Sequence, residues 1–245
     1  MNMEWGFFGP VHIATLVAAA AILIGIYFAL RKAPQKVQVW VLGVLSLSGI
    51  AAIIFNLIRW DNPINYLPLH LCSINAMMLP IAVFTRNKTI GNLLLVWSLG
   101  ALVALVLNFE MTGTELFSES FNFYYFPHIF EFGIPVLLFK LGLVKKDPRC
   151  IVSTLSITMA IYTVVHIINT CINTYIPGAD VNYMFSIEAT NPLTELFYKL
   201  IPCQYWYMYL VLPIAAVYLL GVYTPQIRAN LRQRKAKKLA AEAVA

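Results

Sequence analysis

The sequence predicts an all-α membrane protein, a bundle of seven transmembrane helices with the N-terminus outside the cell and the C-terminus in the cytoplasm. Hydrophobic residues make up 60% of the 245-residue chain and charged residues only 11%, whereas roughly a quarter of a soluble domain is charged. Apolar runs recur along the chain, and positive charges gather in every second connection between them. These observations indicate that the chain folds in a bilayer.

Each predicted helix follows from one apolar run, because about 20 apolar residues cross the hydrocarbon core as a helix. The first run is not expected to be a cleaved signal peptide, since Glu4 stands where such a peptide carries positive charge. The runs fill one transmembrane domain, residues 1–227, followed by a basic cytoplasmic tail, residues 228–245. They are Pro10 to Leu30, Val37 to Ile58, Tyr66 to Phe84, Thr89 to Phe109, Asn122 to Val144, Ile151 to Ile176 and Tyr205 to Thr224.

Charge sets the predicted orientation. Of the 17 lysines and arginines, 15 lie in or beside the connections after the first, third and fifth runs or in the tail. Since cytoplasmic loops carry the excess of Lys and Arg, this side is predicted to be cytoplasmic. The tail holds six of these cations, so the net charge of +6 is local and indicates no nucleic-acid partner. We interpret the tail as a topology anchor, with binding of anionic lipid head groups as the alternative.

All four histidines are predicted to lie in the outer half of the membrane. His12 lies near the outer end of the first helix, while His70, His128 and His166 fall within a few turns of the outer ends of the third, fifth and sixth helices. Polar groups inside a bilayer need a partner or a function. The shared depth predicts a polar cavity that opens outwards. The connection Ile176 to Tyr205 is long, aromatic and rich in proline, which favours a functional cover.

Helical spacing sorts the polar residues into stripes, because residues three, four and seven apart share a helix face. We expect Glu131 to orient the imidazole of His128 or to hydrogen-bond with it. The three stripes are His166, Asn169 and Asn173; Cys72 and Asn75; and His128 and Glu131.

Cys72 is the candidate nucleophile. It follows Pro68 near the start of the third helix, and a helix N-terminus favours a thiolate. His70 is two residues away, about 200° round a helix, so it is not expected to be the base for Cys72. His128 or His166 is the better candidate, and cysteine with histidine suits acyl transfer.

Plainer interpretations stay open for the same residues. Cys72 also fits a small apolar filler, and the histidines fit hydrogen-bonded packing between helices. Cys171 and Cys203 approach the outer face, so a disulfide between them is open, whereas Cys150 is expected to be inert. No ligand spacing indicates a metal, and no motif indicates a cofactor. The seventh helix contains no lysine for a retinal Schiff base.

The stretch Leu67-Pro68-Leu69-His70-Leu71-Cys72-Ser73 resembles the YwaF-like family of bacterial integral membrane proteins. The segment Asn182-Tyr183-Met184-Phe185 and the position of His128 after a Tyr-Tyr-Phe run fit the same family over nearly the whole chain. That family is similar to the eukaryotic acyltransferases called transmembrane protein 164 and, more remotely, to androgen-induced hydrolases of fatty-acid esters. The resemblance implies Cys72 as the acyl-accepting nucleophile and a histidine, preferably His128, as general base.

Together these features predict a multi-pass protein of the bacterial plasma membrane that acts as an acyltransferase or lipid hydrolase, with a phospholipid or another acylated lipid as substrate and no cofactor. A carrier or receptor that binds a small solute in the same cavity is the alternative, and a structural partner of a membrane complex is a third. The expected catalytic residues are Cys72, His128 and His166, and the expected substrate-binding residues are His70, Asn75, Glu131, Asn169, Asn173, Asn182 and Tyr183.

Overall fold

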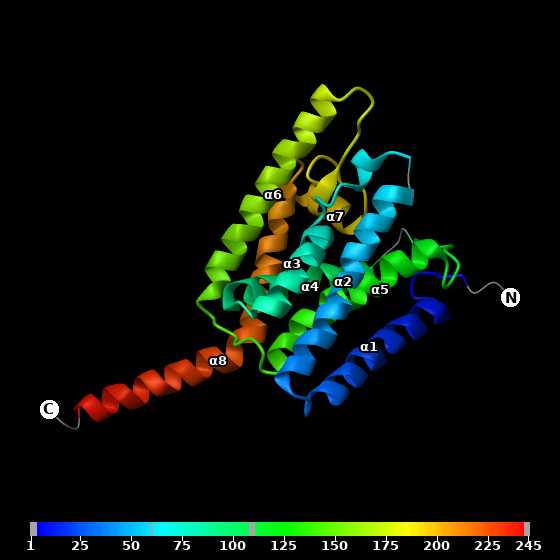
Figure 1. The fold of residues 1–245 in the computed structure, drawn as a ribbon. Helices are drawn as coiled ribbons and strands as arrows, with labels where there is room; N and C mark the ends of the chain where they lie inside the picture. The colour runs from blue at the N-terminus through cyan, green and yellow to red at the C-terminus, as the bar shows by residue number, and fades with distance from the viewer. Residues whose placement is uncertain (1–3, 60, 108–110, 243–245) are drawn as a thin grey trace.

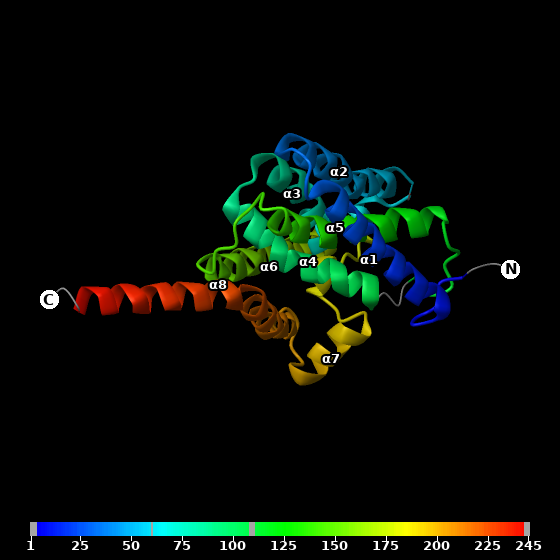
Figure 2. The ribbon, with the colours of Figure 1, turned by 90° about the horizontal axis from the view of Figure 1, so that it is seen from below.

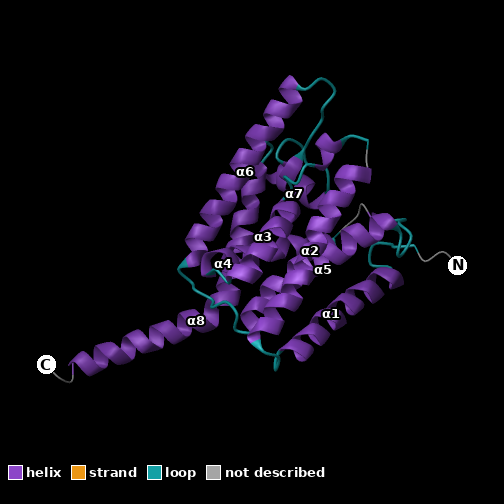
Figure 3. Ribbon diagram, viewed as in Figure 1, coloured by secondary structure: helices purple, strands orange, loops and turns teal. Residues whose placement is uncertain are grey.

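The structure, a computed structural model, describes residues 4–59, 61–107 and 111–242, with side chains up to residue 236. Within these ranges the regular structure is helical, apart from one isolated bridge between Glu4 and Glu115 (Figure 3). The long helices are α1 (Pro10–Leu30), α2 (Gln35–Arg59), α3 (Leu71–Thr85), α4 (Lys88–Val106), α5 (Glu119–Lys140), α6 (Cys150–Tyr175) and α8 (Val211–Glu242). Shorter elements are α7 (Pro192–Leu200) and the 3-10 helices η1 (Pro63–Tyr66), η3 (Tyr183–Phe185) and η4 (Trp206–Leu210).

Helix α4 forms the centre of the bundle. Ten of its 19 residues are buried, and it packs against α3, α5, α6 and α8. Helix α1 lies along one edge beside α5 (Figure 1), and most of its side chains are exposed. Helix α7 projects from the side of the bundle in Figure 2, and the C-terminal part of α8 extends away from the other helices.

Five helical segments are long and apolar enough to cross a membrane, within the described residues: α1, α2, α4, α6 and Trp206–Ala236. Helix α3 is apolar but only 15 residues long. Helix α5 has 22 residues but carries the polar side chains Asn122 and His128 in its first half and Glu131 just beyond its midpoint. The chain is therefore a multi-pass membrane protein.

Helix α3 begins later than the sequence predicts. The predicted run starts at Tyr66, whereas the helix starts at Leu71 and His70 is its extended N-cap residue. The cause is Pro68, which disfavours helical dihedrals in the residue before it, and Leu67 is accordingly extended. His70 therefore precedes the helix, and Cys72 lies in its first turn.

Other element boundaries also differ from the prediction. Helix α5 stops at Lys140 instead of Val144, because Gly142 adopts a positive φ and the following N–H groups turn back onto the carbonyl of Leu138. The long outer connection contains α7, which was not predicted. Helix α8 continues without interruption across the predicted boundary at residue 228. The predicted end of the fourth run, at Phe109, lies outside the described residues.

The predicted cytoplasmic end is held by one buried amide, Asn92 of α4. Its Nδ2 donates to the carbonyls of Lys88 (2.7 Å) and Lys145 (3.3 Å). Its Oδ1 accepts from the Asp147 N–H (3.2 Å) and from the Tyr223 hydroxyl. One side chain thus joins α4, the connection between α5 and α6, and α8.

Candidate functional site

A short segment of the connection between α6 and α8, residues 181–186 and hereafter the cap, lies on the polar stripe of α6. Asn173 exchanges two hydrogen bonds with the backbone of Val181 (2.9 and 2.8 Å). Asn169, fully buried, donates to the Tyr183 carbonyl (2.8 Å) and accepts from the Tyr183 N–H (3.2 Å). The two side-chain amides therefore supply the hydrogen bonds that water makes to these backbone groups in the unfolded chain.

Ser186 joins the cap to the end of the stripe farthest from the C-terminus of α6. Its hydroxyl accepts from Asn169 Nδ2 (2.9 Å) and lies 3.1 Å from His166 Nδ1. The three polar residues share one face as the sequence predicts, and the cap lies against that face.

Two tyrosines fix the other sides of the cap. The buried hydroxyl of Tyr183 donates to the carbonyl of Ile64 in η1, and Tyr207 of η4 donates to the carbonyl of Phe185. Asn182 instead organises the turn that follows, accepting from the N–H groups of Ile187 (3.0 Å) and Glu188 (3.2 Å). The cap is thereby tied to α6, η1 and η4 together.

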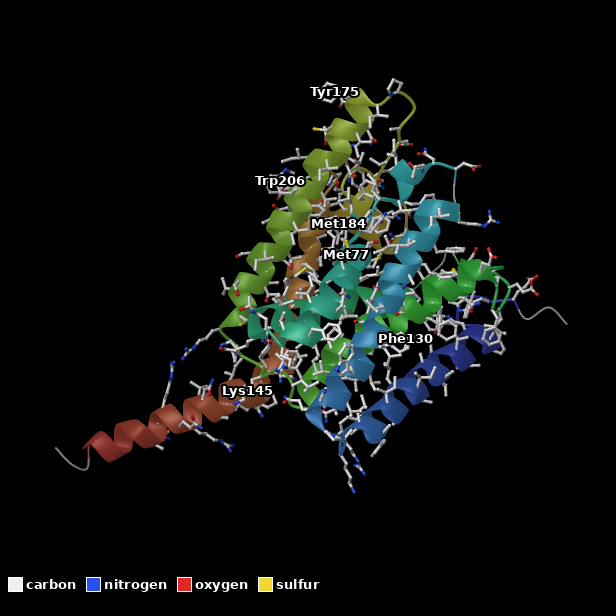
Figure 4. All side chains as sticks on the ribbon, viewed as in Figure 1. Met77, Phe130, Lys145, Tyr175, Met184 and Trp206 are labelled. Carbon is white, nitrogen blue, oxygen red and sulfur yellow. The ribbon has the colours of Figure 1, made fainter. Side chains whose placement is uncertain are left out.

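The cap also covers the start of α3. The N–H of Met184 donates to His70 Nδ1 (3.3 Å), and the His70 ring packs edge-on against Tyr183. Met184 belongs to a hydrophobic cluster that includes Leu71 and Ile74 of α3, and Figure 4 shows its position. Met184 and Phe185 both have φ near +55°, a conformation that costs L-residues free energy and persists where surrounding contacts impose it.

Cys72 lies in the first turn of α3 and shares a helix face with Asn75. No side chain caps this N-terminus, and the N–H groups and dipole of a helix start favour a nearby anion. Asn75, one turn after Cys72, donates to the Glu131 carbonyl on α5, so Cys72 lies on the side of α3 that faces α5.

Asn75 and Glu131 meet where α3 and α5 pack. Asn75 Nδ2 donates to the backbone carbonyl of Glu131 (3.4 Å), and both side chains are buried. A β-carbon at Gly49 of α2 would lie 2.6 Å from Ala76 Cβ and 3.3 Å from Glu131 Oε1, so the glycine permits this close approach. Asn75 Oδ1 and Glu131 Oε2 have no hydrogen-bond partner within the described chain.

His128 lies on α5, one turn before Glu131, but the two side chains do not orient each other. The ring stacks on Tyr124, and its Nδ1 lies 2.6 Å from the Tyr124 carbonyl oxygen. Because a carbonyl only accepts, Nδ1 carries the proton and Nε2 holds a lone pair. Among the residues that the structure describes, nothing hydrogen-bonds to that Nε2. The predicted pairing with Glu131 is thus replaced by a bond within the helix.

The other histidines use their lone pairs in structural contacts. His12 accepts from the Phe8 N–H (3.0 Å) and lies 3.0 Å from the carbonyl of Leu105, so both ring nitrogens are occupied. His70 Nδ1 accepts from Met184. The Ser186 hydroxyl accepts from Asn169, so its proton is available for His166 Nδ1. His128 is therefore the histidine of the four whose basic nitrogen has no partner in the described structure.

The structure divides the predicted site residues into two groups. Cys72, Asn75 and Glu131 meet at the contact between α3 and α5, with His128 one turn along α5 from Glu131. The described contacts include none between Cys72 and a histidine ring. The second group is in or under the cap: His70, His166, Asn169, Asn173, Asn182 and Tyr183.

Sequence reasoning missed three residues that position the site. Tyr124 supplies the carbonyl for His128, Ser186 joins the cap to α6, and Gly49 admits Glu131. The contact of His128 with Tyr124 could have been predicted, because residues four apart are neighbours on a helix. Nothing in the sequence distinguishes Ser186 from other loop serines, or Gly49 from other glycines in apolar helices.

No group of three or more histidine, cysteine or acidic side chains suited to a metal occurs in the part of the chain that is described. All four cysteines are free, including Cys171 and Cys203. Two surface pockets have linings that include none of the predicted site residues, although the first adjoins the turn held by Asn182. One, of about 370 Å³, is lined by Ile187, Glu188, Ala189, Tyr198 and Gln204, and the other, of about 310 Å³, by Trp40, Val41, Val44 and Leu45.

Comparison with known proteins gives one match. No curated protein and no solved structure matches the chain. The sequence model of the TMEM164 family matches residues 7–223, which include α1 to α7, the cap and the first part of α8. The chain belongs to the TMEM164 family.

Proposed function

We propose that this chain is a membrane-embedded acyl-transfer enzyme, an acyltransferase or lipid hydrolase, in which Cys72 is the nucleophile and His128 the general base. The observation that carries the proposal is the Nε2 lone pair of His128, which has no hydrogen-bond partner among the described residues and belongs to the helix that packs against the Cys72 face of α3. Cys72 precedes Asn75 by three residues, as His128 precedes Glu131, so both lie one turn from the same contact.

The reaction follows from these groups. His128 Nε2 takes the thiol proton of Cys72, and the thiolate attacks the carbonyl carbon of a lipid ester. The uncapped N–H groups at the start of α3 stabilise the negative oxygen that forms. Collapse breaks the ester bond, His128 returns the proton to the leaving alcohol, and the acyl group remains on Cys72 as a thioester. A second alcohol, or water, then releases it by the same steps.

The proposal includes seven membrane spans, α1 to α6 and α8, with the cap on the outer side. This arrangement makes a phospholipid of the outer leaflet a better acyl donor than a cytoplasmic thioester. Asn75 and Glu131 would hold the lipid or the second alcohol, because each has an acceptor oxygen without a partner. A bacterial plasma membrane is the proposed location.

The test is labelling of the purified protein with a lipid-like, thiol-reactive acyl ester. The chain used has Cys171 and Cys203 replaced by serine, because both are exposed free thiols. In this chain we expect Cys72→Ala to abolish labelling and His128→Ala to lower its rate by about 10²-fold or more, the usual contribution of a general base. His166→Ala is the matched control, since His166 Nδ1 lies 3.1 Å from the Ser186 hydroxyl in the cap. It should retain labelling if it stays monodisperse in detergent.

Labelling that persists in Cys72→Ala, or that falls equally in His128→Ala and His166→Ala, would contradict the proposed site. The first result would favour the alternative in which the chain binds a solute without covalent chemistry. Release of the label by added lysophospholipid rather than by water would identify the enzyme as a transferase.

A further inference from the structure

Helix α7 leaves an apolar stripe without a protein partner. Leu193, Leu196 and Leu200 follow i, i+3, i+7 spacing and so lie on one face. Leu196 and Leu200 are 52% and 65% exposed. The helix is attached through a different face, on which Thr194 and Phe197 are buried, and it packs against η4. The leucine stripe is thus not what holds α7 on the protein.

The charged residues of α7 lie on a separate face. Glu195 and Lys199 are four residues apart and both exposed. Successive residues of a helix are about 100° apart, so Glu195 and Lys199 point away from the buried face. Their face is roughly a third of a turn round the helix from the leucine stripe. The helix therefore presents one side to protein, one apolar side and one charged side. This three-way division is typical of a helix that lies in the plane of a membrane surface.

The chain itself specifies where α7 lies relative to the membrane. Helix α7 ends at Leu200, and the last apolar segment long enough to cross a membrane begins at Trp206. Trp206 is 53% exposed, and tryptophan concentrates at membrane interfaces. Figure 2 shows α7 projecting from the side of the bundle, away from most of the long helices.

The helix is also built to persist at such a surface. Asn191 and Thr194 form a capping box, with Asn191 Oδ1 accepting from the N–H groups of Leu193 (3.1 Å) and Thr194 (3.0 Å). Pro192 occupies its first turn. A nine-residue helix with a satisfied N-terminus presents its leucines in a fixed direction.

We propose that α7 is an interfacial helix whose Leu196 and Leu200 insert among the acyl chains of the leaflet next to the cap, while Glu195 and Lys199 face water. Because α7 lies between the cap and α8, this insertion fixes the cap at the height of the lipid head groups. The polar pocket lined by Glu188, Tyr198 and Gln204 then opens on the aqueous side of the helix.

Spin labelling tests the proposal in the full chain. Exposed Cys171 and Cys203 are first replaced by serine, and single cysteines are introduced as Leu196→Cys, Leu200→Cys, Glu195→Cys or Lys199→Cys. The labelled proteins are reconstituted in vesicles of phosphatidylethanolamine and phosphatidylglycerol. Collision of each label with oxygen, which partitions into lipid, is compared with collision with a water-soluble nickel chelate. The parent without an added cysteine gives the background.

We expect labels at 196 and 200 to have an oxygen-to-nickel collision ratio several-fold higher than labels at 195 and 199. Equal ratios at all four positions would place α7 in water and overturn the proposal. Low collision with both reagents at 196 and 200 would show protein on the stripe, a second copy or a partner, and would overturn it as well. The labels are on exposed positions, and monodisperse behaviour in detergent before reconstitution excludes misfolding as the cause.

Discussion

Asn169 shows how a single side chain decides whether a polar stripe is a ligand site or a structural one. Its amide donates to Tyr183 and Ser186 and accepts from Tyr183, so each of its functional groups is engaged by the cap. A buried amide whose hydrogen-bonding groups are all used within the protein stabilises the fold and cannot bind a substrate as well. Asn75 and Glu131, at the contact between α3 and α5, each keep one oxygen without a hydrogen-bond partner in the described chain.

Replacement of Asn169 should therefore loosen the cap. Asn169→Ala leaves the N–H and carbonyl of Tyr183 without partners in a buried place, and each orphaned group costs about 1–3 kcal/mol. We expect faster hydrogen exchange at the amide of Tyr183 and a lower thermal midpoint. Thr170→Ala is the matched control, because the exposed Thr170 hydroxyl bonds only to its own helix at the His166 carbonyl (2.9 Å). Unchanged exchange at Tyr183 in Asn169→Ala would refute this account of the cap.

At the residue scale, the sequence predicted the stripes but not their partners. The i, i+3, i+7 spacing of His166, Asn169 and Asn173 follows from helical geometry alone. The cap that binds them begins eight residues after Asn173, at Val181, and its path depends on the positive φ angles of Met184 and Phe185. Neither methionine nor phenylalanine favours a positive φ, so this path of the chain could not be predicted from the sequence.

At the scale of elements, long apolar helices were predictable and interrupted ones were not. The bounds of α1 and α6 agree with their apolar runs to within one residue. Helix α3 was misplaced because apolar residues continue through Tyr66 to His70 while Pro68 prevents a helix there. Helix α7 was missed because nine residues bounded by prolines resemble a loop in a search for membrane spans.

The connection between α4 and the α5–α6 turn makes stability depend on pH. The Lys88 ammonium donates to Asp147 at 2.6 Å and the Arg149 N–H donates at 2.9 Å, which together hold the pKa of Asp147 below its usual value. A depressed pKa stabilises the fold above the unfolded-state pKa of about 3.9, and the contribution disappears as the pH falls through the lower folded value.

We accordingly expect Asp147→Asn to be less stable than the unaltered protein at neutral pH, by a small amount because the pair is partly exposed. The difference should shrink as the pH falls below about 4, where the carboxyl is protonated in the unfolded chain. Thermal midpoints of both proteins in detergent from pH 7 to pH 3 measure this. A difference that does not change with pH would rule out the ionic contact as its source.

At the scale of the whole molecule, seven membrane spans would put the two termini on opposite sides of the bilayer. Helices α1 to α6 and α8 form one bundle around α4, and the cations gather at one end of it. Figure 4 shows Lys145 at the opposite end of the molecule from Tyr175. If all seven helices cross the membrane, the connection after α6 lies outside and the end of α8 inside.

Labelling of intact cells with a membrane-impermeant maleimide checks this topology. In a chain with Cys171 and Cys203 replaced by serine, Asp180→Cys should react in intact cells, since Asp180 is exposed in the outer connection. Arg234→Cys, on the exposed far part of α8, should react only after permeabilisation. Reaction at both positions in intact cells would place both outside the cell. An even number of spans would then separate them, which contradicts the proposed topology.

The cap has a consequence for competition between nucleophiles. The hydrogen bond from the Met184 N–H to His70 holds the cap over the start of α3, and Cys72 lies in the first turn of that helix. In the proposed reaction, a thioester on Cys72 that was open to bulk water would be lost mainly to hydrolysis. A thioester shielded by the cap would last until a lipid alcohol, arriving within the leaflet, reached it. Cap closure would therefore favour exchange of acyl chains between lipids over their release as free acids.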